Sequence, residues 1–325
     1  MNRQQIVVTG GYGFIGSRFV KYVVENTDFN VVIIDKNTYA ADKKRVTSWL
    51  DPQKHAGRVQ HYIADIAHDE LCLQTGNVLQ QADYVVNFAA ETHVDNSITD
   101  GSPFMKTNVR GVFNLLETVR GNKNLKRFVQ ISTDEVYGDM TEIRGGRLGA
   151  DEGFKLQGSS YYSASKASAD LLVQACNRTY GVPYLITRTC NNFGPNQHPE
   201  KFLPKLIKSI EEGAEVPVYG DGEQVREWIH VDDNVKFLFH LMIHAPRDQV
   251  YNIGSGETHK NIDIVKMTEQ LVGKDVKYKY VKDRLGHDRK YYLNCEKLTR
   301  LMGRRPMLTT LEYFLAGEVV EHLKG

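Results

Sequence analysis

The sequence predicts an α/β protein built on a doubly wound parallel sheet. Short β-branched runs alternate with longer segments of helical period, a pattern typical of successive β-α units. The runs are apolar along nearly their whole length, as expected of strands that helices cover on both faces. The chain has 325 residues, more than one hydrophobic core usually supports. We therefore expect a second, smaller lobe after the sheet domain.

Six strands are expected in the first part of the chain. The first covers residues 6–9, and the others follow at 31–35, 59–63, 84–88, 127–132 and 184–188. Helical periodicity between them predicts helices at about 14–27, 69–81, 103–121 and 160–180. Gly121 and Gly181 stand where the last two helices should stop, because glycine readily adopts the left-handed conformation of a helix C-terminus. These elements predict a domain over residues 1–189.

After residue 189 the pattern changes to shorter elements. Asn191 to Pro195 form a turn cluster, and paired glycines at 220/222 and 254/256 separate the segments that follow. Helices are expected at about 231–245, 261–273 and 309–323. Residues 190–325 are therefore expected to form mainly a smaller ligand-binding lobe. The glycine- and charge-rich stretch 141–159 is expected to be an exposed loop.

Composition argues against several classes of protein. The chain has 41 basic and 40 acidic residues, so no overall charge favours nucleic acid or an anionic membrane. The N-terminus has no signal-peptide pattern, and no apolar window is long enough to cross a membrane, so a cytoplasmic protein is expected. The four cysteines lie far apart without a CxxC pair, which favours reduced thiols and predicts no metal site.

A glycine-rich turn follows the first expected strand and precedes a helix. Glycines at 10, 13 and 16 let the turn tighten, let a pyrophosphate approach the helix N-terminus, and let the helix pack close to the strand. Asp35 ends the second strand, 19 residues after Gly16, where its carboxylate can accept both hydroxyls of an adenosine ribose. This spacing predicts a Rossmann dinucleotide site. Asp35 favours NAD over NADP because its charge repels a 2′-phosphate, although Lys36 could weaken that preference.

Two further strand ends are expected at the same site. Asp65 and Ile66 follow the third strand, where Asp65 could meet the adenine or cap a helix. Phe88, Ala89 and Ala90 end the fourth strand, and the small side chains leave room for the cofactor.

Tyr162 and Lys166 are four residues apart on an expected helix, so their side chains share one face. An ammonium beside a phenol favours the phenolate and lowers the phenol pKa, which makes the tyrosine a usable base for a sugar hydroxyl. Thr133 ends the fifth strand and offers a second hydroxyl. The three residues resemble the catalytic set of the extended short-chain dehydrogenases/reductases.

Asp134 and Glu135 come directly after Thr133. Two adjacent carboxyl groups in a buried cleft repel each other unless one keeps a proton. Such a pair suits divided acid and base work, whereas the alternative is a solvated turn or a helix cap. Hydride transfer needs no further carboxyl groups, so the pair indicates a second chemical step.

The chain resembles the dTDP-glucose 4,6-dehydratases over nearly its whole length. The matching segments are residues 10–16, 35–40, 89–95, 132–138, 162–167, 188–195, 199–201, 219–222, 226–228 and 283–289. The Thr-Asp-Glu run at 133–135 is the discriminating segment, because related 4-epimerases and decarboxylases usually carry other residues there.

The resemblance implies a reaction and a role for each catalytic residue. Tyr162, assisted by Lys166 and Thr133, takes the proton of the C4 hydroxyl while C4 is oxidised with NAD. Glu135 then removes the C5 proton and Asp134 protonates the C6 hydroxyl, so that water leaves. Hydride returns to C6, giving a 4-keto-6-deoxy sugar without an external reductant.

The resemblance also implies the binding residues and a homodimer paired through the helices at 103–121 and 160–180. The expected NAD-binding residues are Gly10, Gly13, Phe14, Ile15, Gly16, Asp35, Lys36, Asn37, Thr38, Asp65, Ile66, Phe88, Ala89, Ala90, Thr107, Tyr162, Lys166 and Asn192. The expected residues for the nucleotide-diphosphate sugar are Thr92, Asn191, Lys201, Phe202, Pro217, Tyr219, Arg226, Asn261, Arg284 and His287. Among them, Arg226 and Arg284 would grip the diphosphate, because a guanidinium binds phosphate oxygens in a bidentate way.

Three features depart from the family pattern. Residues 40–44 lack the usual glycine and asparagine, Leu285 replaces a common proline, and the loop at 141–158 has an unusual glycine and arginine content. Three other functions stay open: a UDP-glucose 4,6-dehydratase, a nucleotide-sugar 4-epimerase, and a catalytically idle NAD-binding regulator. The last would be expected to lack the tyrosine or the lysine, and both are present.

Overall fold

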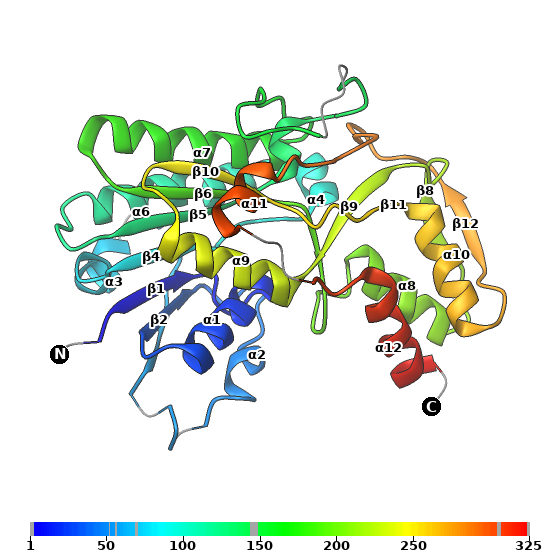
Figure 1. The fold of residues 1–325 in the computed structure, drawn as a ribbon, viewed down its shortest axis with the longest axis horizontal. Helices are drawn as coiled ribbons and strands as arrows, with labels where there is room; N and C mark the ends of the chain where they lie inside the picture. The colour runs from blue at the N-terminus through cyan, green and yellow to red at the C-terminus, as the bar shows by residue number, and fades with distance from the viewer. Residues whose placement is uncertain are drawn as a thin grey trace.

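The computed structural model describes residues 3–51, 53–55, 57–68, 71–143, 149–303 and 307–323. Within these residues the largest feature is a seven-stranded sheet, all of whose strands run parallel (Figure 1). From edge to edge the strands are β10 (Gln249–Ile253), β6 (Tyr184–Thr189), β5 (Arg127–Thr133), β4 (Tyr84–Asn87), β1 (Gln5–Thr9), β2 (Asn30–Asp35) and β3 (Val59–Ile63). The order reverses between β1 and β4, which opens a crevice at their carboxyl ends.

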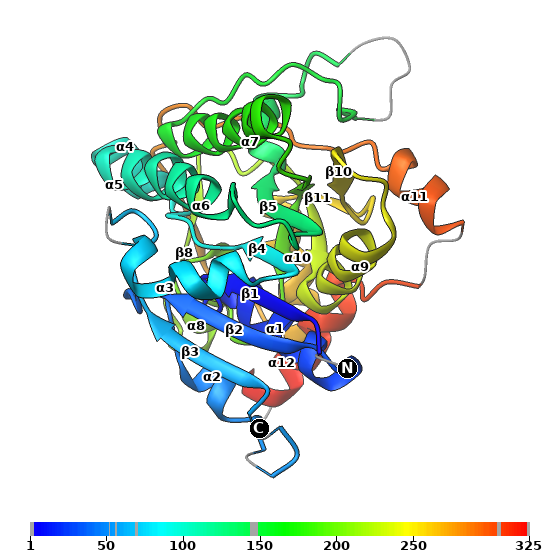
Figure 2. The same ribbon diagram turned by 90° about the vertical axis from the view of Figure 1, so that its left-hand side faces the viewer.

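Helices cover both faces of this sheet (Figure 2). One face carries α3 (Leu71–Gln80), α6 (Val112–Val119) and α7 (Tyr161–Tyr180), and the other carries α1 (Phe14–Asn26) and α9 (Val231–His244). Side chains of β1 alternate between the two cores: Ile6 and Val8 pack with Phe19 of α1, whereas Val7 packs with Leu115 of α6. The predicted doubly wound α/β class is confirmed.

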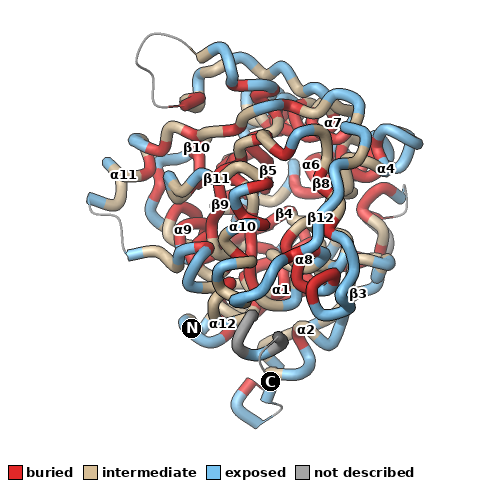
Figure 3. Tube along the Cα trace, turned by 90° about the vertical axis from the view of Figure 1, so that its right-hand side faces the viewer, coloured by how far each residue is buried: buried red, intermediate tan, exposed pale blue. Residues whose placement is uncertain are grey.

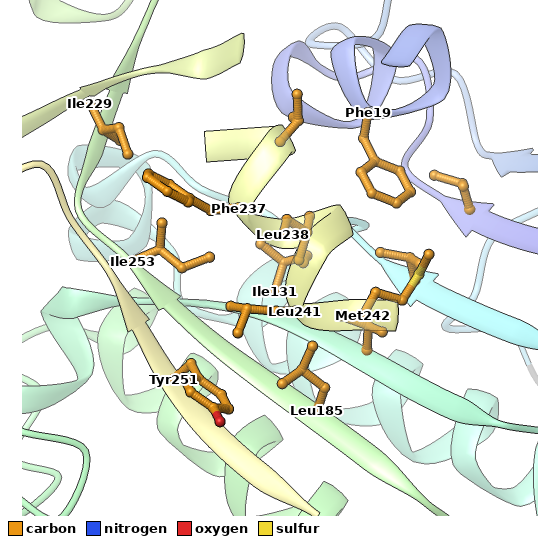
Figure 4. Packing of buried hydrophobic residues seen from close by; sticks show 14 of the residues in the cluster. Phe19, Ile131, Leu185, Ile229, Phe237, Leu238, Leu241, Met242, Tyr251 and Ile253 are labelled. Carbon is orange, nitrogen blue, oxygen red and sulfur yellow. The ribbon is translucent and has the colours of Figure 1, made fainter. Parts of the chain in front are cut away.

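The seventh strand, β10, comes from beyond the expected domain boundary. It pairs with β6, and α9 lies between this part of the sheet and α1, with Phe237, Leu241 and Met242 in the shared core (Figure 4). The chain therefore returns to the large sheet after residue 189, and the expected count of six strands was wrong. The physical reason is that α9 has an apolar face that only this side of the sheet can bury.

The remaining elements form the smaller lobe. In the described chain it contains a three-stranded sheet of β11 (Thr258–Lys260), β9 (Val225–His230) and β7 (Asn191–Phe193), and a parallel pair of β12 (Tyr278–Val281) and β8 (Val216–Tyr219). Its helices are α8 (Phe202–Glu211), α10 (Asn261–Val272) and α12 (Leu311–Leu323). A separate apolar core around Trp228, Leu206 and Ile264 holds these elements together. In Figure 3, β12 lies on the exposed outside of this lobe.

The expected helix at 103–121 is divided into three helical segments. A short turn α5 (Ser102–Phe104) leads into a π-helical segment η1 (Met105–Gly111) and then into α6. Asn108 lies in this π-helical segment. Its side-chain oxygen accepts the backbone amide of Glu91 at 2.9 Å, and its side-chain nitrogen donates to the carbonyl of Glu91 at 3.0 Å. Helices interrupted in this way are frequent at functional sites.

Among the described residues, four α-helices lie outside the predicted helices: α2 (Lys44–Thr47), α4 (Val94–Thr99), α8 and α11 (Glu296–Met302). The stretch 141–159 is not simply an exposed loop. Residues 144–148 lie outside the described part, but Ala150 is fully buried and its amide donates to the carbonyl of Tyr292 at 2.9 Å. Contacts with a distant segment hold this part of the stretch in place, and sequence periodicity cannot show such contacts.

The described residues lack both a membrane-spanning helix and a metal-binding cluster. None of their helices is long and apolar enough to cross a membrane. They contain no cluster of three or more side chains suited to bind a metal ion. Cys176, Cys190 and Cys295 are buried and form no disulfide.

Candidate active site

The turn between β1 and α1 forms one end of the site. Gly10 has φ +69°, and a Cβ at this position would lie 2.6 Å from the backbone nitrogen of Ala89. A Cβ on Gly16 would lie 2.3 Å from the carbonyl oxygen of Gly10. Glycine is required at both positions because backbone atoms occupy the space that a side chain would need. The amide groups at the start of α1 therefore remain open toward the crevice, as a bound pyrophosphate requires.

Asp35 ends β2 beside this turn. Its two carboxylate oxygens accept the backbone amides of Tyr12 at 3.0 Å and Asn37 at 2.8 Å. Burial raises the pKa of Asp35, and these two amides and Lys36 limit the rise. Asn37 takes the left-handed conformation (φ 55°) to point its amide at Asp35, so it acts through its backbone rather than by lining the cavity. The carboxylate is thus fixed in position as a hydrogen-bond acceptor.

Lys36 is held by neighbouring polar side chains. Its ammonium donates to Glu91 and to Thr107, both at 3.2 Å, and lies 4.0 Å from Asp65. Asp65 also accepts the amide of Ala67 at 2.9 Å, so it caps its own turn as well as lining the cavity. Because two carboxylates offset the charge of Lys36, this lysine gives little support to NADP binding.

Replacing Asp35 by Asn should weaken NAD binding by about ten- to a hundredfold, because charge-assisted hydrogen bonds to the ribose would be lost. NADP binding should strengthen at the same time, since the charge that repels a 2′-phosphate is gone. Calorimetric titration of both cofactors tests this. Asp51→Asn, at an exposed turn, is the matched control and should leave both affinities unchanged. Unaltered selectivity in the Asp35 variant would contradict the assigned role.

A cleft of about 900 Å³ runs from this turn to the smaller lobe. The expected residues that line it are Gly10, Gly13, Phe14, Ile15, Gly16, Phe88, Ala90, Thr92, Thr133, Glu135, Tyr162, Lys166, Asn191, Asn192, Lys201, Phe202, Pro217, Tyr219, Arg226, Asn261, Arg284 and His287. Those that line an adjoining cavity of about 90 Å³ are Asp35, Lys36, Thr38, Asp65, Ile66, Ala89 and Thr107. Only Asn37 and Asp134, of the expected residues, border neither space.

Asn192 supplies an open acceptor in the cleft. Its amide nitrogen donates to Thr189 at 3.2 Å and to the carbonyl of Cys190 at 3.0 Å, whereas its side-chain oxygen is buried without a hydrogen-bond partner in the described chain. A buried acceptor without a partner is costly unless a ligand satisfies it. With the glycine turn and Asp35, this atom fits a bound dinucleotide.

Tyr162 and Lys166 lie in the first turns of α7, whose N-terminus is fixed by a capping box between Ser160 and Ser163. The Lys166 ammonium donates to the carbonyl of Ile131 on β5 at 2.5 Å. Thr133 ends the same strand and contributes a hydrogen bond to the Tyr162 phenol. The helix and the strand end together bring the three predicted residues to one wall of the cleft.

The expected lowering of the tyrosine pKa is not found. Burial raises the pKa of Tyr162, as do the nearby carboxyl groups of Glu135 and Asp134, and the Thr133 hydroxyl only partly opposes them. The expectation failed because helical spacing shows that Lys166 is near, but it does not show desolvation or the charges on the facing segment.

Asp134 and Glu135 lie on a 3₁₀ turn, η2 (Asp134–Tyr137), and have different surroundings. Asp134 is 1% exposed, and its Oδ1 accepts the Thr133 hydroxyl at 3.1 Å. Its Oδ2 is buried with no hydrogen-bond partner among the described residues. Burial, and then the charges of Glu135 and Glu227, raise the pKa of Asp134 well above its ordinary value. Asp134 therefore holds its proton more readily than an ordinary carboxyl group.

Glu135 is partly buried and lines the cleft. Burial raises its pKa, and the cations of Arg226, Lys201 and Arg284 oppose the rise. Glu135 is thus the member of the pair that more readily ionises. The two carboxyl groups differ as a divided acid and base require.

Three cations of the smaller lobe face this pair across the cleft. Arg226 on β9 donates to two backbone carbonyls, those of Val225 at 2.9 Å and Asp288 at 2.8 Å. Arg284 lies 3.3 Å from Asp95 and 4.6 Å from the Tyr219 ring centre. Lys201 donates to the carbonyl of Thr92 at 3.1 Å. A cleft with this charge suits a phosphate-bearing ligand.

Tyr291 is a cleft residue that the sequence analysis missed. Its hydroxyl donates to Asp288 at 2.5 Å, and the Arg226 guanidinium lies 4.4 Å from its ring centre. Asp288 also accepts the Ser159 hydroxyl at 2.6 Å, next to the start of α7. No sequence signal distinguishes Tyr291 from a surface tyrosine. Its place in the cleft depends on packing between two parts of the chain, because Tyr291 lies more than a hundred residues after Tyr162. His93, Glu200 and Trp228 also line the cleft without having been predicted.

The chain is similar to known proteins in both sequence and structure. The sequence profile of the "NAD dependent epimerase/dehydratase family" matches residues 6–254. The chain is 44% identical to "Low-salt glycan biosynthesis protein Agl12" of Haloferax volcanii, over 93% of each chain. It is 38% identical to a dTDP-glucose 4,6-dehydratase of Shigella flexneri, over 99% of this chain and 96% of the other. The crystal structure of DesIV, a dTDP-glucose 4,6-dehydratase from Streptomyces venezuelae with NAD bound, superposes with a TM-score of 0.87 at 35% identity, covering 98% and 96% of the two chains.

Proposed function

Because the chain belongs to the NAD-dependent epimerase/dehydratase family, we propose that it is a dTDP-glucose 4,6-dehydratase, forming dTDP-4-keto-6-deoxyglucose. NAD is its cofactor, and Asp35, the glycine turn and Asn192 are the residues proposed to hold it. The observation that carries the proposal is the pair of carboxyl groups near Tyr162: Asp134 is buried, whereas Glu135 lines the cleft.

The first step is the loss of the C4 hydroxyl proton to Tyr162. NAD, when bound, would supply a reversible acceptor for the hydride that C4 loses and C6 later gains. Lys166 supplies a positive charge on the same wall, which favours the phenolate, and Thr133 holds the phenol by its hydrogen bond. Tyr162 is therefore proposed as the general base for C4 oxidation.

The C4 ketone acidifies C5, and the elimination follows. Glu135 takes the C5 proton, while Asp134 supplies the proton with which the C6 oxygen leaves as water. Asp134 lies behind the cleft wall, but its carboxyl contacts the cleft-lining Thr133 hydroxyl. Once C6 has been reduced, Glu135 gives the proton that it removed back to C5. Overall, the substrate loses one water molecule, and no external reductant is consumed.

The diphosphate of the substrate is proposed to lie against Arg226 and Arg284. The two guanidinium groups are fixed by carbonyls, by Asp95 and by tyrosine rings, so little conformational freedom is lost when they bind phosphate. Asn261 and His287 are proposed to meet the nucleoside end, and Thr92 the sugar. Their common position along one cleft supports this assignment.

Incubation with dTDP-glucose and UDP-glucose, each in heavy water, tests the function. The proposal expects loss of one water from dTDP-glucose, deuterium at C5 in the product, and slower or no reaction of UDP-glucose. Faster dehydration of UDP-glucose would assign the uridine substrate instead. A C4 epimer without loss of water would contradict the dehydratase assignment.

We also infer that the protein is a homodimer paired through η1, α6 and α7. These helices expose large apolar side chains, among them Phe113 at 40% and Leu171 at 56%. α6 and α7 lie in contact, so the apolar side chains belong to adjoining helices. A second copy with the same face would bury them in a two-fold interface. The cytoplasmic location stays a prediction.

The Leu171→Glu variant should dissociate this dimer, because it places a charge in the apolar face of both copies. Loss of two buried leucines should weaken association by about a hundredfold or more. Sedimentation velocity measures the change. Tyr313→Glu, at a 76% exposed position on α12, is the control and should leave the mass unchanged. A wild-type protein that sediments as a monomer would overturn the inference.

A further inference from the structure

The catalytic lysine has a buried acidic neighbour that the mechanism above does not use. Asp170 follows Lys166 by four residues on α7, so the two side chains lie one turn apart on the same face. Asp170 is fully buried, and its negative charge raises the pKa of Lys166. We propose that Asp170 is a positioning residue that keeps Lys166 in its ammonium form, an inference that rests on the proposed function.

The position of Asp170 is fixed by a buried ion pair. Arg188 on β6 donates through Nε to Asp170 Oδ2 at 2.9 Å, and the two side chains are 3% and 0% exposed. The other carboxylate oxygen, Oδ1, is buried without a hydrogen-bond partner in the described part of the chain. Burial raises the pKa of Asp170, and its ion pair with Arg188 opposes that rise and so favours the charged carboxylate.

Arg188 is itself anchored, so the pair cannot turn away. Its Nη1 donates to the Tyr137 hydroxyl at 3.0 Å and to the carbonyl of Glu152 at 3.2 Å. The Tyr137 hydroxyl donates in turn to Asn252 on β10 at 2.7 Å. These bonds join β6, η2 and β10, three elements that are far apart in sequence. These hydrogen bonds restrict the Arg188 guanidinium and, through it, the Asp170 carboxylate.

Lys166 needs this support because it is buried on the cofactor side of α7. Desolvation lowers its pKa to about 8, close to neutral pH, and its ammonium makes the hydrogen bond to Ile131 described above. The charged and titratable groups that face this region are Asp170 and Tyr162 on α7, Asp134 and Glu135 on η2, and Arg188 on β6. Of these, Asp170 is the acidic group one helical turn from Lys166, and its charge opposes the lowering of the Lys166 pKa by burial.

The sign of the pH effect follows directly. The ammonium is populated below the Lys166 pKa and is lost as the pH rises through it. Without the negative charge of Asp170 this pKa falls, so the neutral amine appears at lower pH. Activity that needs the ammonium should therefore end at lower pH in an Asp170 variant.

The test compares Asp170→Asn, Asp170→Glu and wild-type holoenzyme across pH. We expect the alkaline limb of the kcat–pH profile to shift to lower pH by about one unit or more in Asp170→Asn. In Asp170→Glu this limb should return toward its wild-type position. Asp233→Asn removes another buried, hydrogen-bonded carboxyl, on α9 outside the cleft, and should lower the denaturation midpoint without moving the limb. An unmoved limb in Asp170→Asn would overturn the proposal.

A double variant separates positioning from loss of a buried pair. Asp170→Asn alone leaves Arg188 buried without its carboxylate, which destabilises a protein. Asp170→Asn with Arg188→Met removes both charges, so a stable protein that still shows the shifted limb supports the proposal. A stable double variant with the wild-type limb contradicts it.

A substrate-independent measurement distinguishes this proposal from the proposed function. The Lys166 signal of protein labelled with ¹³C at lysine Cε, assigned with Lys166→Arg, reports the titration by NMR. A lower Lys166 pKa in Asp170→Asn is expected even if dTDP-glucose is not the substrate. The same titration in both proteins would reject the role of Asp170, whatever the wild-type enzyme converts.

Discussion

Replacing Tyr162 by Phe should stop the reaction before any sugar is oxidised. The ring remains to fill its place, but the phenol oxygen that accepts the C4 hydroxyl proton is gone, so turnover should fall by about 10²- to 10⁴-fold. NAD content should be retained, because the glycine turn and Asp35 are unchanged. Mixing with dTDP-glucose should therefore give neither product nor the absorbance of reduced nicotinamide.

Tyr161→Phe is the matched control for this variant. Tyr161 is the adjacent residue on α7, is 63% exposed, and does not line the cleft. Its loss of a hydroxyl should leave turnover unchanged. If Tyr162→Phe still reduced the nicotinamide at the wild-type rate, another group would have to be the base.

Replacing Asp134 by Asn and Glu135 by Gln should separate oxidation from elimination. Each change is isosteric and removes one proton-transfer function, so water loss should fall by about 10²- to 10⁴-fold in either variant. C4 oxidation does not need these groups, so reduced nicotinamide should form and then persist. Rapid-mixing absorbance and mass spectrometry of the sugar measure the two steps separately.

The two variants should differ in exchange at C5. Glu135→Gln should also abolish deuterium uptake at C5, whereas Asp134→Asn should allow uptake without loss of water. Glu142→Gln, at an exposed position after the same segment, should behave as wild type. Full turnover in both cleft variants would reject the division of acid and base.

Sequence reasoning reached the parts of the site that depend on local spacing. The glycines at 10, 13 and 16 are constrained by a turn that closes within a few residues, and Asp35 is fixed by backbone amides nearby. The Tyr162 and Lys166 pair follows from helical period alone. These features need no knowledge of distant segments, so a single sequence predicts them.

The electrostatics of the site could not be predicted in the same way. Asp134 and Glu135 are neighbours in sequence, yet the tight 3₁₀ turn points them differently, and Glu227 from β9 adds its charge to one of them. The pKa of Tyr162 depends on burial that periodicity does not show. Tyr291 and the Asp170–Arg188 pair likewise depend on contacts between distant strands.

Transfer of a label within one sugar molecule tests the central claim most directly. dTDP-glucose carrying deuterium on C4 would be converted by the holoenzyme without added NADH, and the 4-keto-6-deoxy product analysed by NMR. The account predicts deuterium on C6 of the product, because the hydride taken from C4 is the one returned after water has left. A product without deuterium at C6, or recovery of a C4 epimer that has kept its C6 hydroxyl, would contradict it.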